Sequence, residues 1–246
     1  MTRIYAAAAI SIACIASAAL GVGLPGRAQT IVRMAERPRM GHPQQGTRRG
    51  GGSRGGQCDL PTNIPPLTAL MPDPEAWVDA AAPIVFSFTD RAMPDLWFYL
   101  PARLLAMGQV TFTLKDASGE TLEQRQLETA SQRPTAPNIV RVSLAELELA
   151  LAPGADYHWY LTVRCESGPP MSVDGWISYL PGDPLERSDS RFLVDTLSVL
   201  ASRQWSNPDD EAALLAWREL LESVGLGDIT DADLTDCCSF VEKIQN

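Results

Sequence analysis

The chain has 246 residues, of which 45% are hydrophobic, 20% charged and 7% aromatic, with 18 Gly and 19 Pro. This is enough for one domain with a sizeable core, with or without an appendage. The two histidines, His42 and His158, and five Cys leave little room for a histidine-based metal site or a His-dependent catalytic triad. No stretch after residue 24 reaches the ~20 apolar residues needed to span a bilayer.

Residues 1–28 have the pattern of a signal peptide. Arg3 is followed by an apolar stretch from Ile4 to Leu24, and Gly26 and Ala28 place small residues at positions −3 and −1 of a cleavage site. A retained anchor helix is the alternative, but the glycines and the proline before the site favour cleavage. We therefore expect a mature chain that begins at Gln29 and is exported to the periplasm, the cell envelope or the medium.

Residues 29–57 form an Arg/Gly-rich segment that we expect to be a disordered linker, dispensable for folding. The segment carries six Arg and one Glu, a net charge of +5, whereas residues 58–246 carry 12 basic and 29 acidic side chains, a net charge of −17. Such runs can bind nucleic acid, but nucleic acid is an unlikely partner for an exported protein. The Gly51-x-Ser53-x-Gly55 match to a nucleophile motif lies inside a glycine run and reflects composition alone.

Residues 58–181 carry β-strand patterns. Val110, Phe112 and Leu114 alternate with polar residues, which is typical of a strand buried on one face. The expected strands span 84–89, 96–100, 110–115, 121–128, 139–144, 157–164 and 173–179. Seven short strands separated by turn signals predict an antiparallel, two-sheet β-sandwich of the immunoglobulin or fibronectin-III-like type.

A tyrosine in the sixth of these strands supports that type of sandwich. Pro153-Gly154 is followed by Tyr157, and Trp159, Leu161 and Val163 alternate after it. This resembles a tyrosine corner, in which the hydroxyl bonds to upstream backbone and the ring joins the core. We expect Tyr157 to have a structural role.

Residues 182–246 have helical spacing, so we expect a helical segment that packs on the sandwich. Asn207-Pro208 followed by acidic residues predicts a helix N-terminus with Asn207 as the cap. Leu214, Trp217 and Leu221 line one face of that helix, and Gly225 is a natural stop. A short last helix is expected to begin near Thr230.

Four cysteines remain after the expected cleavage. In an oxidising compartment their even number suggests disulfides, whose connectivity the sequence leaves open. One alternative links a C-terminal cysteine to the sandwich, and the other is a bridge within the sandwich with the C-terminal pair free or bonded to each other. The candidates are Cys58, Cys165, Cys237 and Cys238.

The sequence offers no catalytic, cofactor-binding or metal-binding constellation. Asp228, Asp231, Asp233 and Asp236 lack the ligand order of a calcium-binding EF-hand loop, and helix capping explains two of them more simply. We therefore expect no cofactor and no enzymatic activity.

Aromatic side chains are the remaining candidates for a binding surface. Trp159 is in step with Tyr157 and is expected in the core. The other aromatic rings of these strands are either exposed on the surface of the sandwich or covered by the C-terminal helices. The candidates for a binding face of the sandwich are Phe98, His158, Tyr160 and Tyr179.

Several segments in order resemble domain-of-unknown-function family 928. They are Arg54-Gly55-Gly56-x-Cys58, Leu67–Pro72, Leu96–Pro101, Tyr157–Val163, Gly175-Trp176-Ile177, and Asn207–Leu226 with Cys237-Cys238. The resemblance covers nearly the whole expected mature chain. It implies an exported bacterial protein and carries no activity, cofactor or catalytic residue.

Two hypotheses for function follow. The first is a non-catalytic interaction module of the cell envelope or of the secreted fraction, with a protein partner. The second is a carbohydrate-binding or carbohydrate-active protein that uses the aromatic face of the sandwich.

Overall fold

The computed structural model describes residues 46–50, 61, 63–76, 84–102, 104, 109–129, 137–165, 169–182, 190–235 and 238–240. All of them belong to one compact unit, residues 33–246. The expected signal peptide, residues 1–28, lies outside the described residues.

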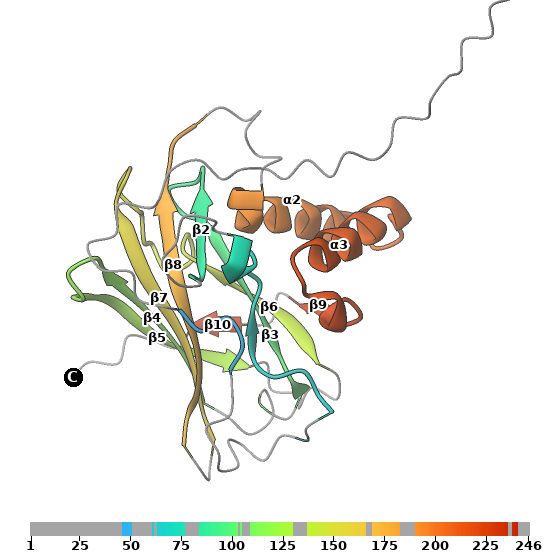
Figure 1. Cartoon of the computed structure of the whole chain (residues 1–246), viewed down its shortest axis with the longest axis horizontal. Coiled ribbons are helices and arrows are strands. Elements are labelled where there is room, and N and C mark those ends of the chain that lie inside the picture. The colour runs from blue at the N-terminus through green and yellow to red at the C-terminus, as the bar shows by residue number, and fades with distance from the viewer. Residues whose placement is uncertain are drawn as a thin grey trace, which may run out of the picture. The chain divides into compact units, whose positions relative to one another are not determined.

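The described strands form two sheets, of six and four strands (Figure 1). The six-stranded sheet has the order β10-β5-β4-β7-β8-β2 and the four-stranded sheet the order β1-β3-β6-β9. The first sheet contains β2 (Phe86–Thr89), β4 (Gln109–Asp116), β5 (Thr121–Thr129), β7 (Asp156–Arg164), β8 (Met171–Tyr179) and β10 (Cys238–Phe240). The second contains β1 (Thr68–Ala69), β3 (Asp95–Leu100), β6 (Asn138–Ser143) and β9 (Asp233–Thr235).

Two α-helices follow the last long strand. They are α2 (Leu193–Ser206) and α3 (Glu211–Ser223), and short 3-10 turns are η1 (Pro74–Ala76), η3 (Ser190–Phe192) and η4 (Gly227–Ile229). The prediction of a mainly β fold with helices near the C-terminus is confirmed. Each of the seven predicted strands is present with slightly shifted ends.

The pairing is not antiparallel throughout. β2 runs parallel to β8, and β9 runs parallel to β6. Members of each pair lie far apart in the sequence, so no hairpin constrains their direction. The expectation of a purely antiparallel sandwich is therefore wrong at these edge strands.

Large apolar side chains fill the space between the two sheets. Phe98 of β3 and Trp159 of β7 are both fully buried, and their rings meet edge to face at 5.4 Å. Phe112 and Leu161 belong to the same core cluster. This arrangement confirms the core position predicted for Trp159.

The other face of the four-stranded sheet is covered by the helices. Trp97 of β3 is fully buried, donates its indole N–H to Ser198 Oγ of α2 at 3.1 Å, and contacts the ring of Trp217 of α3. Tyr99 and Ile139 join these helical residues in a second core cluster. The helices thus form a third layer against the sandwich, as expected.

The tyrosine corner is confirmed. Tyr157 is 8% exposed, and its hydroxyl accepts a hydrogen bond from the backbone N–H of Ala152 at 2.9 Å. The ring packs in the main core. Tyr157 therefore ties the Pro153-Gly154 turn to β7, as the motif predicts.

The C-terminal segment is less helical than the sequence suggested. The expected short helix near Thr230 is absent from the described residues, where the turn leads into β9, and β10 then joins the other sheet. Helix α3 is capped by Asp210, whose carboxylate accepts the Ala213 N–H, so the predicted cap at Asn207 is wrong. Gly225 does end this region, with a φ of 73° that favours glycine.

Part of the predicted linker belongs to the folded unit. In the docked segment Gly46–Gly50, the N–H of Thr47 donates to the Asp174 carbonyl, and Arg48 and Gly50 pair with the backbone of 67–69. The Arg48 guanidinium donates to the Val224 carbonyl. The rest of the linker, 29–45 and 51–57, lies outside the described residues.

Arginine side chains attach this docked segment to the end of α3 and to η4. Arg49 donates two hydrogen bonds to the Asp228 carboxylate, at 2.6 and 2.7 Å, and a third to the Gly225 carbonyl. Burial lowers the pKa of Arg48 to about 10, so it stays protonated at neutral pH. An Arg/Gly-rich composition therefore does not prevent docking, because the guanidinium groups find carbonyl and carboxylate acceptors.

A pair of truncations tests this docking. A chain that starts at residue 46 should keep the thermal midpoint of the mature protein, whereas a chain that starts at residue 51 should lose roughly 5–10 °C, because several backbone and charge-assisted hydrogen bonds disappear. Differential scanning calorimetry measures both. Equal thermal midpoints for the two truncated chains would contradict the docking and show that the segment before residue 51 is dispensable for folding.

Candidate functional site

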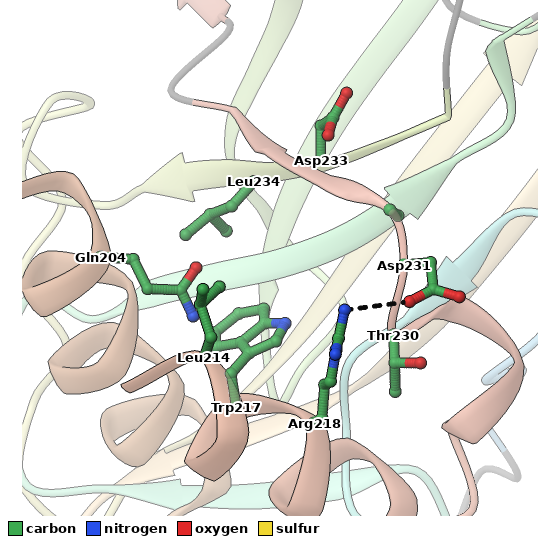
Figure 2. A pocket seen from close by; sticks show the side chains of 9 residues that line it. Gln204, Leu214, Trp217, Arg218, Thr230, Asp231, Asp233 and Leu234 are labelled. Atoms are coloured by element: carbon green, nitrogen blue, oxygen red, sulfur yellow. Dashed lines mark hydrogen bonds and ion pairs between the residues drawn. The ribbon is translucent and has the colours of Figure 1, made fainter. Parts of the chain in front are cut away.

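A small pocket lies where α2 and α3 meet the strand β9. We call it the helix–strand pocket; its volume is about 210 Å³. Figure 2 shows Gln204 reaching from α2 toward Leu214 and Trp217 of α3, while Arg218 extends toward Asp231. The lining residues are Gln204, Leu214, Trp217, Arg218, Thr230, Asp231, Ala232, Asp233 and Leu234.

The helix–strand pocket combines an indole with polar groups that are weakly engaged. Nε2 of Gln204 is buried and has no hydrogen-bond partner among the described residues. Arg218 donates to Asp231 at 3.3 Å, but their side chains are 56% and 89% exposed, so this pair adds little stability. A bound molecule can thus take up the amide donor and the charged groups at small cost.

A second hollow lies on the other side of the Thr230–Ala232 turn. We call it the proline-lined pocket; its volume is about 380 Å³, and it shares Asp231 and Ala232 with the first. Tyr99 forms part of its wall, and burial together with the Asp228 carboxylate raises the pKa of this phenol. The other lining residues are Asn63, Ile64, Pro65, Pro101, Ala102, Pro137, Asp228 and Ile229.

A polar aromatic cluster lies on the outer side of the six-stranded sheet. His158 Nε2 is 2.9 Å from an Asp174 carboxylate oxygen, and Nδ1 is 2.8 Å from the Tyr160 hydroxyl. The His158 ring stacks on Trp176 at 4.3 Å, and Lys115 Nζ lies over the Tyr160 ring at 5.2 Å. We call these five residues the outer-face cluster.

The outer-face cluster superficially has the order of a catalytic triad, acid to histidine to hydroxyl. Burial and the Asp174 carboxylate raise the pKa of Tyr160, so the environment makes the phenolate less accessible rather than more. An activated nucleophile needs the opposite shift. The contacts form a hydrogen-bond chain from Asp174 through His158 to Tyr160.

The four predicted binding-face aromatics do not share one open surface. Phe98 lies fully buried between the sheets, so the prediction that it belongs to a binding face is wrong. Every residue from 96 to 100 is buried, so the sequence of this strand shows no alternation that would tell which side chains point outward. Tyr179 packs against the main core. His158 and Tyr160 do lie together, with His158 only 5% exposed and Tyr160 flanked by His158 and Lys115.

Two of the four candidate cysteines, Cys165 and Cys238, are among the described residues. Cys165 follows β7, is half-buried and packs against the main core. Cys58 and Cys237 lie outside the described residues. Cys238 is the first residue of β10, and only its backbone position is described. Across the sheet, β10 is separated from β7 by β5 and β4.

Among the described residues, no group of three or more His, Cys, Asp or Glu side chains is placed to hold a metal ion. No helix in this part of the chain is both long and apolar enough to cross a membrane.

Comparison with known proteins gives a family. The model of the family described as Domain of Unknown Function (DUF928) matches residues 49–234, which is more than half of the chain. The chain belongs to the DUF928 family. No curated protein and no solved structure gives a significant match.

The DUF928 match spans the features that build the site. It begins at Arg49, in the docked segment, and ends at Leu234, in β9. Both pockets lie inside these limits, whereas Cys237 and Cys238 lie beyond them. The family assignment brings no activity with it.

Sequence reasoning missed both pockets and three of the five residues of the outer-face cluster, Lys115, Asp174 and Trp176. Asp174 and Trp176 carry no motif of their own, although Trp176 pairs with His158 across β7 and β8. Gln204 and Arg218 lie on different helices, so only the packing of those helices could bring them to one pocket. The sequence favours helix capping over calcium binding as the role of Asp231 and Asp233, but both residues line the helix–strand pocket.

A buried carboxylate fastens the start of α2 to the β2–β3 connection. Asp195 is 2% exposed, and its two oxygens accept hydrogen bonds from the Thr89 hydroxyl and the Asp90 N–H, each at 2.8 Å. Burial raises its pKa to about 6, although these two hydrogen bonds oppose the shift. Asp195 therefore positions the helical layer.

The raised pKa of Asp195 predicts a pH-dependent stability. Between about pH 4 and pH 6 the folded protein keeps a proton that the unfolded chain releases, so the contribution of Asp195 falls as the pH rises through this window. The unfolding free energy of the native protein minus that of Asp195→Asn should fall by on the order of 2 kcal/mol as the pH rises over that range. Urea titrations at several pH values measure it, and a pH-independent difference would contradict the assignment.

Proposed function

We propose that this DUF928 protein is an exported, non-catalytic interaction module of the cell envelope or secreted fraction that binds a protein partner. The observation that carries the proposal is the pair of pockets around the Thr230–Ala232 turn. Leu214, which lines the helix–strand pocket, is 39% exposed, and the next residue of α3, Leu215, is 59% exposed. Exposed large apolar side chains next to hollows are typical of interaction surfaces.

Several features connect this surface to a rigid support. Trp217 forms part of the helix–strand pocket and also packs against Trp97 of the sheet. Asp228 lines the proline-lined pocket and is held by Arg49 of the docked segment. A partner would therefore meet a preorganised surface, which lowers the entropic cost of binding.

The second candidate function is carbohydrate binding or processing on the outer face of the six-stranded sheet. It is supported by Tyr160, which lies in one cross-strand row with Thr113 and Asp174. The neighbours of its ring, His158 and Lys115, leave less of that ring open for stacking on a sugar. A glycan array with Tyr160→Ala as control separates this candidate from a protein-binding module.

Site-specific photo-cross-linking tests the interaction module. A benzoyl-phenylalanine at position 215, in protein exported by its own host, should give a discrete adduct with an envelope or secreted protein. The matched control is position 122, because Leu122 is a similarly apolar side chain, 41% exposed, on β5 of the other sheet. The same adducts at both positions, or none at position 215, would refute the proposed surface.

The proposal of export brings a disulfide with it. We propose that Cys165 pairs with Cys58. β7 and β10 are three strand spacings apart, about 14 Å, whereas bonded cysteines need Cα atoms within about 7 Å. Consecutive Cα atoms are only about 3.8 Å apart, so this spacing argues against Cys237 as well as Cys238. A bridge to Cys58 would close the N-terminal end.

Peptide mapping of the exported protein under non-reducing conditions checks export and pairing together. The expected N-terminal peptide begins at Gln29, and Cys165 is expected in a cross-linked peptide with Cys58. A peptide that links Cys165 to Cys237 or Cys238 would contradict this pairing. A chain that begins at Met1 with reduced cysteines would contradict export.

A further inference from the structure

The two pockets form one bipartite surface. They share Asp231 and Ala232, so they adjoin at the Thr230–Ala232 turn. In an extended peptide, side chains two residues apart lie on the same side of the backbone. Such a peptide could cross this turn and place one side chain in each hollow. The helix–strand pocket alone, at about 210 Å³, is smaller than the ~300 Å³ usual for small-molecule sites.

Acidic side chains outnumber basic ones on this bipartite surface, although Arg49 of the docked segment pairs with Asp228. Asp228, Asp231 and Asp233 line it, and Arg218 is the one cationic side chain among the lining residues. Arg218 reaches Asp231 through a single exposed contact, and Asp233 makes no ion pair among the described residues. The chain after residue 57 carries a net charge of −17, so its long-range field also favours a cationic partner.

The protein already binds one basic extended segment on the neighbouring surface. Arg49 of the docked segment holds Asp228 with two hydrogen bonds, and Arg48 donates to the Val224 carbonyl. The backbone of the same segment pairs with Leu67 and Ala69. Arginine side chains with extended backbone are therefore the chemistry that this acidic region accepts.

An unpartnered donor points to peptide backbone as the complement. Gln204 Nε2 is buried in the wall of the helix–strand pocket and has no acceptor among the described residues. Leaving a buried donor unpaired costs about 1–3 kcal/mol, and a turn of the Gln204 side chain into the pocket would let an incoming acceptor recover it. An extended peptide offers a carbonyl at every residue, whereas a cationic side chain alone would not satisfy this donor.

We propose that the bipartite surface binds an extended, basic peptide segment of the partner protein. Apolar side chains of the segment enter the two pockets, a backbone carbonyl accepts from Gln204, and Arg or Lys side chains pair with Asp231 and Asp233. This inference rests on the proposed function and specifies the chemistry of the partner.

Fluorescence anisotropy with two labelled heptapeptides tests the proposal on the full mature protein. The probes are amidated peptides with alternating Leu and Arg, or alternating Leu and Glu. The Leu/Arg peptide should bind at least about tenfold more tightly, and raising the salt should weaken it, because the contacts are between exposed charges. Equal binding of the two peptides would overturn the proposal.

Variants locate the binding. The double variant Asp231→Asn/Asp233→Asn should weaken the Leu/Arg peptide about fivefold, and Ala232→Trp should weaken it more strongly, because the indole would take up space where the two pockets adjoin. The matched control, Asp209→Asn/Glu219→Gln, removes two exposed acids of the same helical region that do not line either pocket. Circular dichroism verifies that each variant folds.

The outcomes separate this inference from the proposed function. A loss of affinity in the control as large as in the pocket variant would mean nonspecific attraction and would overturn the inference. A specific adduct at position 215 without binding of the basic peptide would also overturn it while leaving the interaction module standing. Absence of both would remove the proposed function itself.

Discussion

The five consecutive buried residues of β3 determine the architecture. From Leu96 to Leu100, every side chain is at most 2% exposed, although neighbouring side chains on a strand point to opposite faces. Leu96, Phe98 and Leu100 face the six-stranded sheet, while Trp97 and Tyr99 face the other way. Two large aromatic rings on the second face would be costly in water, so a third layer has to cover them.

The helical layer and the pockets follow from that need. Trp97 donates its N–H to Ser198, Asp195 joins the start of α2 to the β2–β3 connection, and Trp217 completes the packing. After α3 the chain must return to the edge of the sheet, which it does through η4 and β9. Both pockets are lined by residues of this return and adjoin at Asp231 and Ala232.

Much of the fold could be predicted from the sequence, because alternation and helical spacing are local properties. The seven long strands, Tyr157 and Gly225 all carry such signals. The short strands β1, β9 and β10 carry none, since two or three residues cannot show a period. Phe98 was misplaced for a related reason: a strand buried on both faces has no alternation to show which side chain points outward.

The site could be predicted far less well, because it depends on contacts between distant residues. Arg48 and Arg49 belong to a stretch whose composition indicates disorder, yet their acceptors lie at Val224 and Asp228. The two pockets arise where residues 63–65, 99–102, 204–218 and 228–234 meet. Contacts between segments so far apart leave no spacing pattern in the sequence, so these groups come together only in the packed structure.

The central claim is that sandwich and helices fold as one unit through the two-sided β3 strand. Native-state hydrogen exchange, read peptide by peptide, tests it most directly. The amides of α2 and of the central strand β7 should open with the same free energy, that of global unfolding. If α2 and α3 exchange at a clearly lower free energy while β4 and β7 stay protected, the helices are a separable appendage and the claim is wrong.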